Sequence, residues 1–538
     1  MIKRIAFFLL ATLFTTFISV AQNIPSQHPK LVVFILIDQL STDQLVAFKD
    51  QFSDHGINRL INGGSFYRNA SYPAGSNYAG SNLATLYTGA HAGTHGIVSD
   101  WWYDHLRGKE VSAAYGDIVV NHQDSIQYPT TERLLASTFL DELKWKNNNT
   151  SRVSSIGFNP NYLIWTGGHR PNFLYRIDPN TGQMEAMPHA KDSIIMPEWA
   201  NKFNKKDFLG TYSKRSWGPL KDLNRYHQMQ FFGDQRMSSG NFLYNLDKQE
   251  GKGAYIPVLH SPYGNKLVRD FAVAKLINDK YGKGDQTDVI TLQFTSKSVH
   301  GTAHSAFDAE TEDMLLRLDE EIADLLKIID HEVGLENALI VTTSITTPNL
   351  QIADQSKYGI PTGVFNGDKA SSLLNLFLMA KYGQGKWVMT YHDGQIHLNH
   401  ELILERKINI EKIRSESTVF LKDMDGIAHA MPVSHLSTLS SNINAFKSLQ
   451  YNYHPRRSGD IVIKLRPGWS EILKDGSKIN RPWSATHLPL ILYGWKVKPQ
   501  NIHKSIPMVN LAPTISSFLE IPFPNANEGT PLEGIIIQ

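Results

Sequence analysis

The chain of 538 residues contains no cysteine, which excludes both disulfide bonds and a lipid anchor attached to a cysteine. It also lacks an excess of charge of one sign, because 53 Lys and Arg residues balance 51 Asp and Glu residues. A net charge of +2 creates no overall field that would attract nucleic acid or an anionic membrane. Nucleic acid is therefore not an expected partner, and any partner must be recognised by a local site.

Long apolar runs are also scarce, and the one at the N-terminus has the layout of a secretory signal. Lys3 and Arg4 precede an apolar stretch over residues 5–20, and small residues stand just before Gln22. We expect residues 1–21 to be a signal peptide whose removal leaves a periplasmic protein, either free or associated with the outer membrane. An uncleaved membrane anchor is the alternative, because the run is nearly long enough to span a bilayer. No later segment is apolar enough to do so.

Unbroken apolar runs rich in Val and Ile predict strands buried on both faces, as in parallel sheets. They lie at residues 31–37, 288–294, 337–344 and 488–495. Between the second and third runs, apolar residues at helical spacing over 312–330 predict a helix packed on the sheet. The expected fold is α/β, with a mostly parallel central sheet flanked by helices.

The remaining segments differ in composition and predict insertions. Residues 172–285 and 355–480 are rich in aromatic residues, Asn, Gly and Lys, with turn signals such as DPNTG and FNGD. We expect the first to form a cap and the second to be another insertion. The core is then built from residues 30–171, 286–354 and 481–538.

Several segments occur in the order found in the alkaline phosphatase superfamily. They are KLVVFILIDQ, LYTGAHAGTHGIVSDWWYD, HPRRSGDIVIKLRPGW, THLPLILYGW and NLAPTISSFLEIP. The chain resembles the Bacteroidetes-type secreted phosphatases that tolerate their own phosphate product. This resemblance implies the superfamily fold and a site where two zinc ions position a Thr or Ser nucleophile for attack on phosphorus.

Carried over residue by residue, the resemblance finds two zinc ligands kept and the other ligand positions lost. Asp38 after the first strand and His487 near the C-terminus match ligands. The other ligand positions hold residues that are poor or impossible zinc ligands: Ser298, Thr302, Ser344 and Ile345.

The positions that would act on substrate are changed as well. The nucleophile position falls on Ala79, which has no oxygen with which to attack. The positions that would hold phosphate carry Ser99, Asn159 and Asn161, so no cation remains there to stabilise a phosphoryl group.

These replacements favour a catalytically inactive protein that binds another periplasmic or outer-membrane protein, or a glycan, with no cofactor. The alternative is a hydrolase of phosphate or sulfate esters with a relocated zinc site. His300 and His304 are four residues apart and would be its extra ligands beside Asp38 or His487. The alternative for these two histidines is that they lie in a loop and bind no metal, because Gly301 between them disfavours a helix.

Overall fold

The computed structural model describes residues 27–73, 78–116, 119–120, 125–126, 129–187, 195–227, 242–297, 307–348, 359, 361–436, 444–473, 476–479 and 487–537. The segment expected to be a signal peptide, residues 1–21, lies outside this part of the chain. Among the described helices, none combines the length and the hydropathy needed to cross a bilayer.

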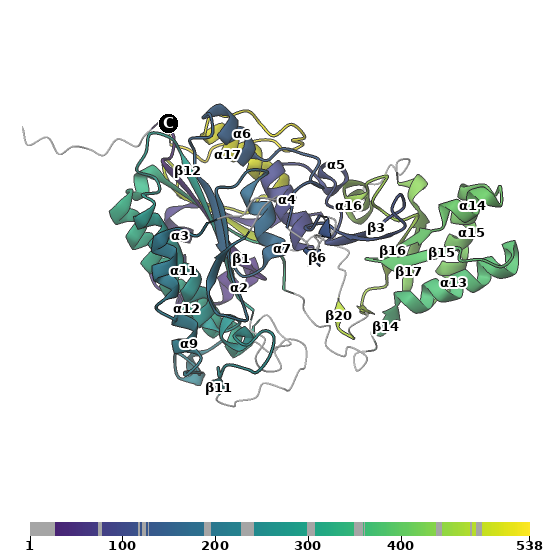
Figure 1. Ribbon diagram of the computed structural model, residues 1–538, viewed down its shortest axis with the longest axis horizontal. Helices are drawn as coiled ribbons and strands as arrows, with labels where there is room; N and C mark the ends of the chain where they lie inside the picture. The colour runs from purple at the N-terminus through teal and green to yellow at the C-terminus, as the bar shows by residue number, and fades with distance from the viewer. Residues whose placement is uncertain are drawn as a thin grey trace, which may run out of the picture.

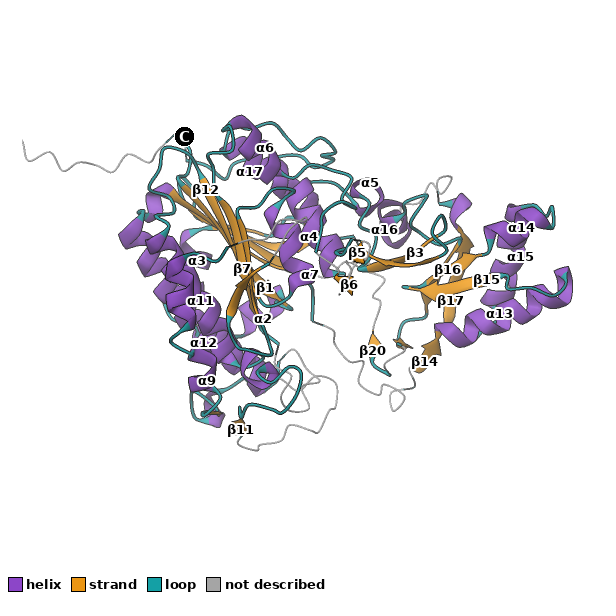
Figure 2. Cartoon of the chain, in the orientation of Figure 1, coloured by secondary structure: helices purple, strands orange, loops and turns teal. Residues whose placement is uncertain are grey.

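The chain has an α/β fold with a large, mostly parallel central sheet flanked by helices (Figure 2). Strand β1 (Leu31–Asp38) lies near its middle and pairs in parallel with β12 (Asp288–Thr295) and β13 (Ala338–Ser344). The order along the sheet is β22-β2-β21-β13-β1-β12-β7-β8-β9, with β23 also pairing with β2. The other strands are β2 (Ser65–Ser71), β7 (Val153–Gly157), β8 (Phe173–Ile177), β9 (Met184–Ala186), β21 (Leu488–Gly494), β22 (Gln500–Ile502) and β23 (Ile506–Pro507).

The four strands predicted from apolar runs are confirmed as β1, β12, β13 and β21. Strand β21 runs antiparallel to β13, so the sheet is mixed on this side. The predicted helix is α12 (Ala309–Glu332), which covers the expected residues with a few more at each end.

Both faces of the sheet are covered, which explains the unbroken apolar sequence of β1. Val33 and Ile35 point into one core cluster, whereas Val32 and Phe34 point into the other. The first cluster is closed by α3 (Ile57–Gly63), α11 (Pro262–Asn278) and α12, and the second by α4 (Ala79–Thr88), α6 (Phe139–Lys146) and α17 (Leu511–Phe518) (Figure 1).

The segment 172–285 departs from the expected cap. It begins with β8, which pairs in parallel with β7 in the central sheet, and it ends with α11, which packs against α12 and β12. Its aromatic residues, among them Tyr175 and Phe271, are buried in the core cluster of the sheet. A high aromatic content here reflects core packing, so this segment extends the core at both of its ends.

The segment 355–480 folds around a hydrophobic cluster of its own and lies at one end of the molecule (Figure 1). We call its described part the insertion. Its four-stranded sheet has the order β15-β16-β18-β17, and a separate sheet joins β14, β19 and β20. Its elements are β14 (Gly363–Asn366), α13 (Gly367–Tyr382), β15 (Val388–His392), β16 (Gln395–Leu398), α14 (His400–Glu405), α15 (Ile410–Lys422), β17 (Ile427–Pro432), α16 (Asn444–Asn452), β18 (Ile461–Leu465), β19 (Trp469–Ile472) and β20 (Lys478–Ile479).

A short hairpin of the core reaches the insertion. It consists of β3 (Trp101–Asp104) and β4 (Lys109–Ser112), and β3 contacts β15. The small helix α5 (Ala92–His95) makes a further contact with α16. The hairpin and α5 both follow α4 in the chain, so the segment after α4 connects the central sheet to the insertion.

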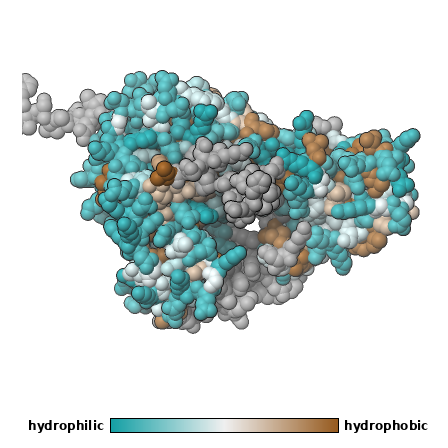
Figure 3. All heavy atoms as spheres, in the orientation of Figure 1, coloured by the Kyte–Doolittle hydropathy of each residue, from teal (hydrophilic) through white to brown (hydrophobic). Residues whose placement is uncertain are grey.

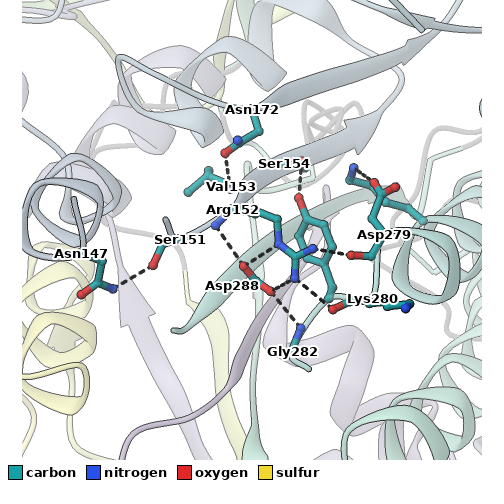
Figure 4. Close-up of polar contacts among 12 residues, drawn as sticks. Asn147, Ser151, Arg152, Val153, Ser154, Asn172, Asp279, Lys280, Gly282 and Asp288 are labelled. Atoms are coloured by element: carbon teal, nitrogen blue, oxygen red, sulfur yellow. Dashed lines mark hydrogen bonds and ion pairs between the residues drawn. The ribbon is translucent and has the colours of Figure 1, made fainter. Parts of the chain in front are cut away.

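At the amino ends of β7 and β12, an ion pair between the partly exposed Arg152 and the buried Asp288 joins the two strands (Figure 4). Arg152 donates from its backbone N and from Nε to Asp288 Oδ1, both at 3.0 Å, and its Nη2 contacts Oδ2. Gly282 N donates to the same Oδ2 at 3.0 Å. Every oxygen of this buried carboxylate is therefore hydrogen-bonded, and we call this group the amino-end network.

Candidate functional site

Asp38 lies at the carboxyl end of β1, the edge at which open parallel sheets bind ligands. Its Oδ1 accepts a hydrogen bond from Thr346 Oγ1 at 2.6 Å. Burial raises the pKa of the Asp38 carboxyl, whereas the Thr346 hydrogen bond and the charge of Lys297 act in the opposite direction. The carboxylate expected from the sequence is thus held by a hydroxyl group from the segment that follows β13.

The next two positions at which the resemblance predicts metal ligands hold Ser344 and Ile345, and both residues make contacts within the fold. Ser344 ends β13, and its Oγ accepts from Leu40 N at 3.1 Å and lies 2.6 Å from Thr346 O. Ile345 is buried in the cluster on the α4 face, and its carbonyl accepts from Asn82 Nδ2 at 3.0 Å. Neither side chain offers a free ligand atom to a metal beside Asp38.

Helix α4 begins at Ala79, whose methyl group is buried at the position that the resemblance gives to the nucleophile. The following amide, Gly80 N, donates to Asp100 Oδ1 at 3.2 Å. The packing here is tight, since a Cβ on Gly80 would lie 2.9 Å from both Asp100 Oδ1 and Trp165 Nε1. A helix N-terminus favours a negative charge, and here the chain's own carboxylate takes that place.

Asp100, which directly follows the predicted residue Ser99, was not singled out from the sequence, yet the structure places it at the start of α4. Burial and the nearby charge of Asp393 raise the pKa of Asp100 to about 6, while His392 acts in the opposite direction. The predicted residue, Ser99, instead contacts Trp101 O and lies 3.3 Å from His392 Nε2. The carboxylate directly after Ser99 in HGIVSD was the available signal.

The two asparagines at the phosphate-holding positions do not form an open polar pair. Asn159 Oδ1 accepts from Asn161 N at 3.0 Å and caps α7 (Pro160–Leu163). Asn161 Oδ1 is buried and has no hydrogen-bond partner within the described part of the chain. Burial raises the pKa of the neighbouring Tyr162, and the charges of Asp38 and Asp100 raise it further, which places this phenol close to both carboxylates.

His487 precedes β21 and lies on a different, open groove of about 580 Å³. Its Nδ1 is hydrogen-bonded to Asn69 Oδ1, and the groove is also lined by Arg68, Phe307 and His503. His487 is exposed. The remaining predicted positions, Ser298, His300, Thr302 and His304, lie outside the described residues.

A second polar group, which the sequence interpretation also missed, lies where the β3–β4 hairpin meets the insertion. We call His105, His397, His400 and Asp460 the imidazole cluster. His105 Nε2 lies 3.4 Å from His397 Nδ1, and the rings of His105 and His400 stack with centroids 4.2 Å apart. His400 Nε2 lies 2.8 Å from Asp460 Oδ1. The only sequence signal was the HLNH spacing of His397 and His400.

Among the described side chains, His105, His400 and Asp460 form the single group of three His, Cys, Asp or Glu residues whose ligand atoms all lie within 4.8 Å of one another. Asp38 and His487, the retained ligand positions, do not belong to such a group. The residues with a metal-like geometry are therefore not those that the resemblance predicts.

The central sheet, with Asp38 and α4 at its carboxyl edge, defines a protein of the alkaline phosphatase superfamily. A family model described as type I phosphodiesterase / nucleotide pyrophosphatase matches residues 32–487, and the chain belongs to this family.

Among curated proteins, the chain is 28% identical over 533 residues to a protein named calcium-transporting ATPase from Myroides odoratus, with 95% of each chain covered. It is 27% identical to alkaline phosphatase PhoV from Synechococcus elongatus, covering 93% of this chain and 92% of that protein. It is 25% identical to alkaline phosphatase PafA from Elizabethkingia meningoseptica, with 95% of each chain covered.

Solved structures show the same fold. The crystal structure of wild-type alkaline phosphatase PafA matches with a TM-score of 0.82 and 23% identity, over 95% of this chain and 99% of that one. A phosphonoacetate hydrolase from Sinorhizobium meliloti matches with a TM-score of 0.52 and 14% identity, over 91% of this chain and 95% of that one.

Proposed function

We propose that this chain is a catalytically inactive member of its superfamily that acts as a secreted binding or scaffold protein. One observation carries the proposal: at the start of α4, the methyl group of Ala79 stands at the nucleophile position, and Asp100 accepts the hydrogen bond of Gly80 N. A methyl group cannot attack phosphorus. A carboxylate at this helix end repels the anionic group that a phosphatase must bind.

The surroundings of Asp38 support the same conclusion. The hydroxyl group of Ser344 is committed to backbone atoms, Ile345 is part of the core, and Asn159 caps a helix. Restoring zinc ligands at these positions would break contacts that now stabilise the fold. In the proposed role, the residues around Asp38 need no cofactor.

For a partner, we propose a periplasmic or outer-membrane protein or a glycan, met after the signal peptide has been removed. Support comes from the insertion, which exposes apolar side chains on three helices: Leu373 and Leu376 on α13, Leu404 on α14 and Val419 on α15. Figure 3 shows hydrophobic patches at this end of the molecule. Clustered exposed apolar residues are typical of interaction surfaces.

A second candidate function is hydrolysis of phosphate or sulfate esters by a relocated metal site. It is favoured by the similarity over nearly the whole chain to proteins that are named alkaline phosphatases. This function requires a nucleophile other than residue 79, such as a metal-bound water, and ligands beyond Asp38. In this candidate the two carboxylates near Tyr162, Asp38 and Asp100, and His300 and His304 would supply those ligands.

Activity assays distinguish the two candidates. The purified mature chain is incubated with p-nitrophenyl phosphate and p-nitrophenyl sulfate, with added zinc or with a chelator. We expect no release of p-nitrophenol above a heat-treated control under either condition. Chelator-sensitive turnover that disappears in Asp38→Asn but persists in Asp285→Asn, an exposed control, would establish the hydrolase instead.

The binding role has a separate test. The mature chain and a Leu376→Asp/Val419→Asp variant are used as baits in periplasmic extract, and the captured proteins and glycans are compared. We expect the parent to retain a partner that the variant loses. Identical recovery from both baits would remove the insertion surface from the proposal.

A further inference from the structure

We infer that the imidazole cluster makes the contact between the β3–β4 hairpin and the insertion sensitive to pH. The hairpin is docked while the rings of His105 and His397 are uncharged, and its turn separates from the insertion when both rings take up protons. The contact joins His105, in the hairpin turn, to β16 and α14, which carry His397 and His400. This inference is independent of the function proposed for the region around Asp38.

His105 and His397 face each other through one ring nitrogen each, and this contact requires a lone pair. His105 Nε2 lies 3.4 Å from His397 Nδ1. In a neutral imidazole one nitrogen carries a hydrogen and the other a lone pair, whereas in an imidazolium both nitrogens carry hydrogens. The two facing nitrogens can therefore share one hydrogen. When both rings are protonated, two N–H groups point at each other and the contact becomes repulsive.

The third ring of the cluster lies flat against His105. The rings of His105 and His400 stack with their centroids 4.2 Å apart and their planes at 15°. Stacked rings of this kind do not direct their nitrogens at a common point. A proton on each ring would instead place two positive charges one ring separation apart, where they repel each other. The stack therefore also favours uncharged imidazoles.

The buried carboxylate beside these rings already has partners. Asp460 Oδ1 accepts from His400 Nε2 at 2.8 Å and from Arg414 Nη2 at 2.6 Å, and its Oδ2 accepts from Leu398 N at 2.8 Å. The guanidinium charge of Arg414 balances the charge of Asp460. A proton on His105 or His397 therefore adds positive charge that this carboxylate does not neutralise.

Other charged and titratable groups face the cluster from neighbouring elements, and none is a buried counter-charge. Asp104 in the hairpin is half-buried, and Glu401 on α14 is exposed. Glu411 on α15 is also exposed and contacts Arg414 Nη1 at 2.5 Å. The remaining groups are phenols or a further imidazole: Tyr103 on β3, Tyr453 after α16 and His392 on β15.

Burial keeps the two facing rings uncharged while the hairpin is docked. It lowers the pKa of His397 from the ordinary value of 6.5 to about 3, and repulsion from His105 lowers it as well. Burial and repulsion from His400 also lower the pKa of His105. The docked state thus binds fewer protons than the separated state. Docking is fully stable above pH 6.5 and weakens as the pH falls below this value.

The experiment measures the distance between the hairpin turn and the insertion in the full mature chain. Because the chain has no cysteine, Leu106→Cys and Val419→Cys place one spin label on each side, at side chains that are 91% and 63% exposed. Pulsed electron paramagnetic resonance gives the distance distribution at pH 7.5 and pH 5.0. We expect a second population at longer distance at pH 5.0.

The size of this effect follows from the protons taken up. A ring that is neutral when docked and has its ordinary pKa when separated raises the ratio of separated to docked chains about 30-fold between pH 7.5 and pH 5.0. We therefore expect the ratio to rise by at least this factor. An unchanged distance distribution at pH 5.0 would overturn the inference.

Variants in the labelled chain test which groups respond. His105→Phe/His397→Leu keeps side chains of similar volume but removes both titrating rings, so it should stay docked at pH 5.0. Each single variant should reduce the separated fraction at pH 5.0, which keeps the test valid if the double variant does not dock. His331→Ala, at a side chain that is 81% exposed, should respond like the parent.

A second pair of labels, Leu404→Cys and Val419→Cys, lies entirely within the insertion and should show no pH-dependent change in distance. A change of the same size in this pair would overturn the inference, because the pH effect would then lie inside the insertion. A response in both single variants equal to that of the parent would overturn it too, since the titrating groups would then be others.

Discussion

The two ends of the central sheet both carry buried carboxylates, but they differ in how these are satisfied. At the amino end, Asp288 has a guanidinium partner, and both of its oxygens accept several hydrogen bonds (Figure 4). At the carboxyl end, Asp38 accepts hydrogen bonds from Thr346 Oγ1 and from the backbone of Gln39 and Thr346, whereas Asp100 accepts one from Gly80 N. Neither carboxylate has a guanidinium partner among the described residues.

The two ends therefore differ in the environment of their carboxylates: Asp288 has a cationic partner, whereas Asp38 and Asp100 do not. At the amino end, the charge of Asp288 is paired with Arg152 and both of its oxygens are hydrogen-bonded, so removing either partner would leave polar groups without their contacts. At the carboxyl end, burial raises the pKa of both carboxyls, which means that their charged forms are disfavoured there. Carboxyls with raised pKa values are common in functional sites, and here Asp100 accepts its hydrogen bond from Gly80, next to Ala79 at the position that the resemblance gives to the nucleophile.

The largest expected effect is at the amino end. Asp288→Asn removes the negative charge that pairs with the partly exposed Arg152 and weakens the hydrogen bonds on both oxygens, and it should lower the free energy of unfolding by about 2–3 kcal/mol. Urea denaturation of the mature chain measures this. Asp285→Asn, in the exposed turn before β12, should change stability by less than about 0.5 kcal/mol. If Asp288→Asn and Asp285→Asn changed the free energy of unfolding equally, the hydrogen bonds of the amino-end network would not contribute to stability as expected.

At the carboxyl end, Asp100→Asn should raise the free energy of unfolding, whereas Asp288→Asn lowers it. In the folded state the pKa of Asp100 is about 6, above its ordinary value of 3.8, so between pH 3.8 and pH 6 the folded protein keeps a proton that the unfolded chain has lost. The free energy of unfolding therefore falls as the pH rises through this range. The variant keeps an acceptor for Gly80 N. It should be more stable than the parent by up to about 3 kcal/mol above pH 6, with the gap closing near pH 4.

Urea denaturation at several pH values, with Asp285→Asn as the control, tests this prediction. The control should show no such pH-dependent gap. A variant less stable than the parent at pH 8 would mean that the Asp100 charge stabilises the start of α4.

A smaller loss is expected for Ser344→Ala. The hydroxyl group accepts from buried Leu40 N and lies 3.0 Å from Ile37 O, so its removal leaves a buried amide without its acceptor. The expected cost is about 1–2 kcal/mol of unfolding free energy. Ser372→Ala, at an exposed helix position, is the matched control. If Ser344→Ala caused no measurable loss of stability, the contacts of this hydroxyl group would not be needed for the fold, which would contradict the prediction.

The smallest effect is expected for Ala79→Ser. The added hydroxyl is buried with residue 79 and should cost about 1 kcal/mol of unfolding free energy. No turnover of p-nitrophenyl phosphate should appear, since a hydroxyl without metals stays protonated at neutral pH. Chelator-sensitive release of p-nitrophenol by this variant alone would show that a working metal site is present around residue 79.

Much of the fold could be predicted from sequence because it follows local patterns. The unbroken apolar runs became β1, β12, β13 and β21, and the helical spacing over 312–330 became part of α12. The role of 172–285 could not be predicted this way. Aromatic residues and turn signals do not show whether a segment covers a site or pairs with the sheet, as β8 does.

By itself, the sequence determined which atoms are available: Ala79 has no oxygen, Ile345 cannot bind a metal, and no cysteine can form a link. Only the tertiary structure decided which of the available groups meet. It placed Asp100 at the start of α4, and it brought His105 to His397, 292 residues further along the chain. Local periodicity sets the strands and helices, but contacts across such separations depend on how those elements pack, and no short stretch of sequence encodes that packing.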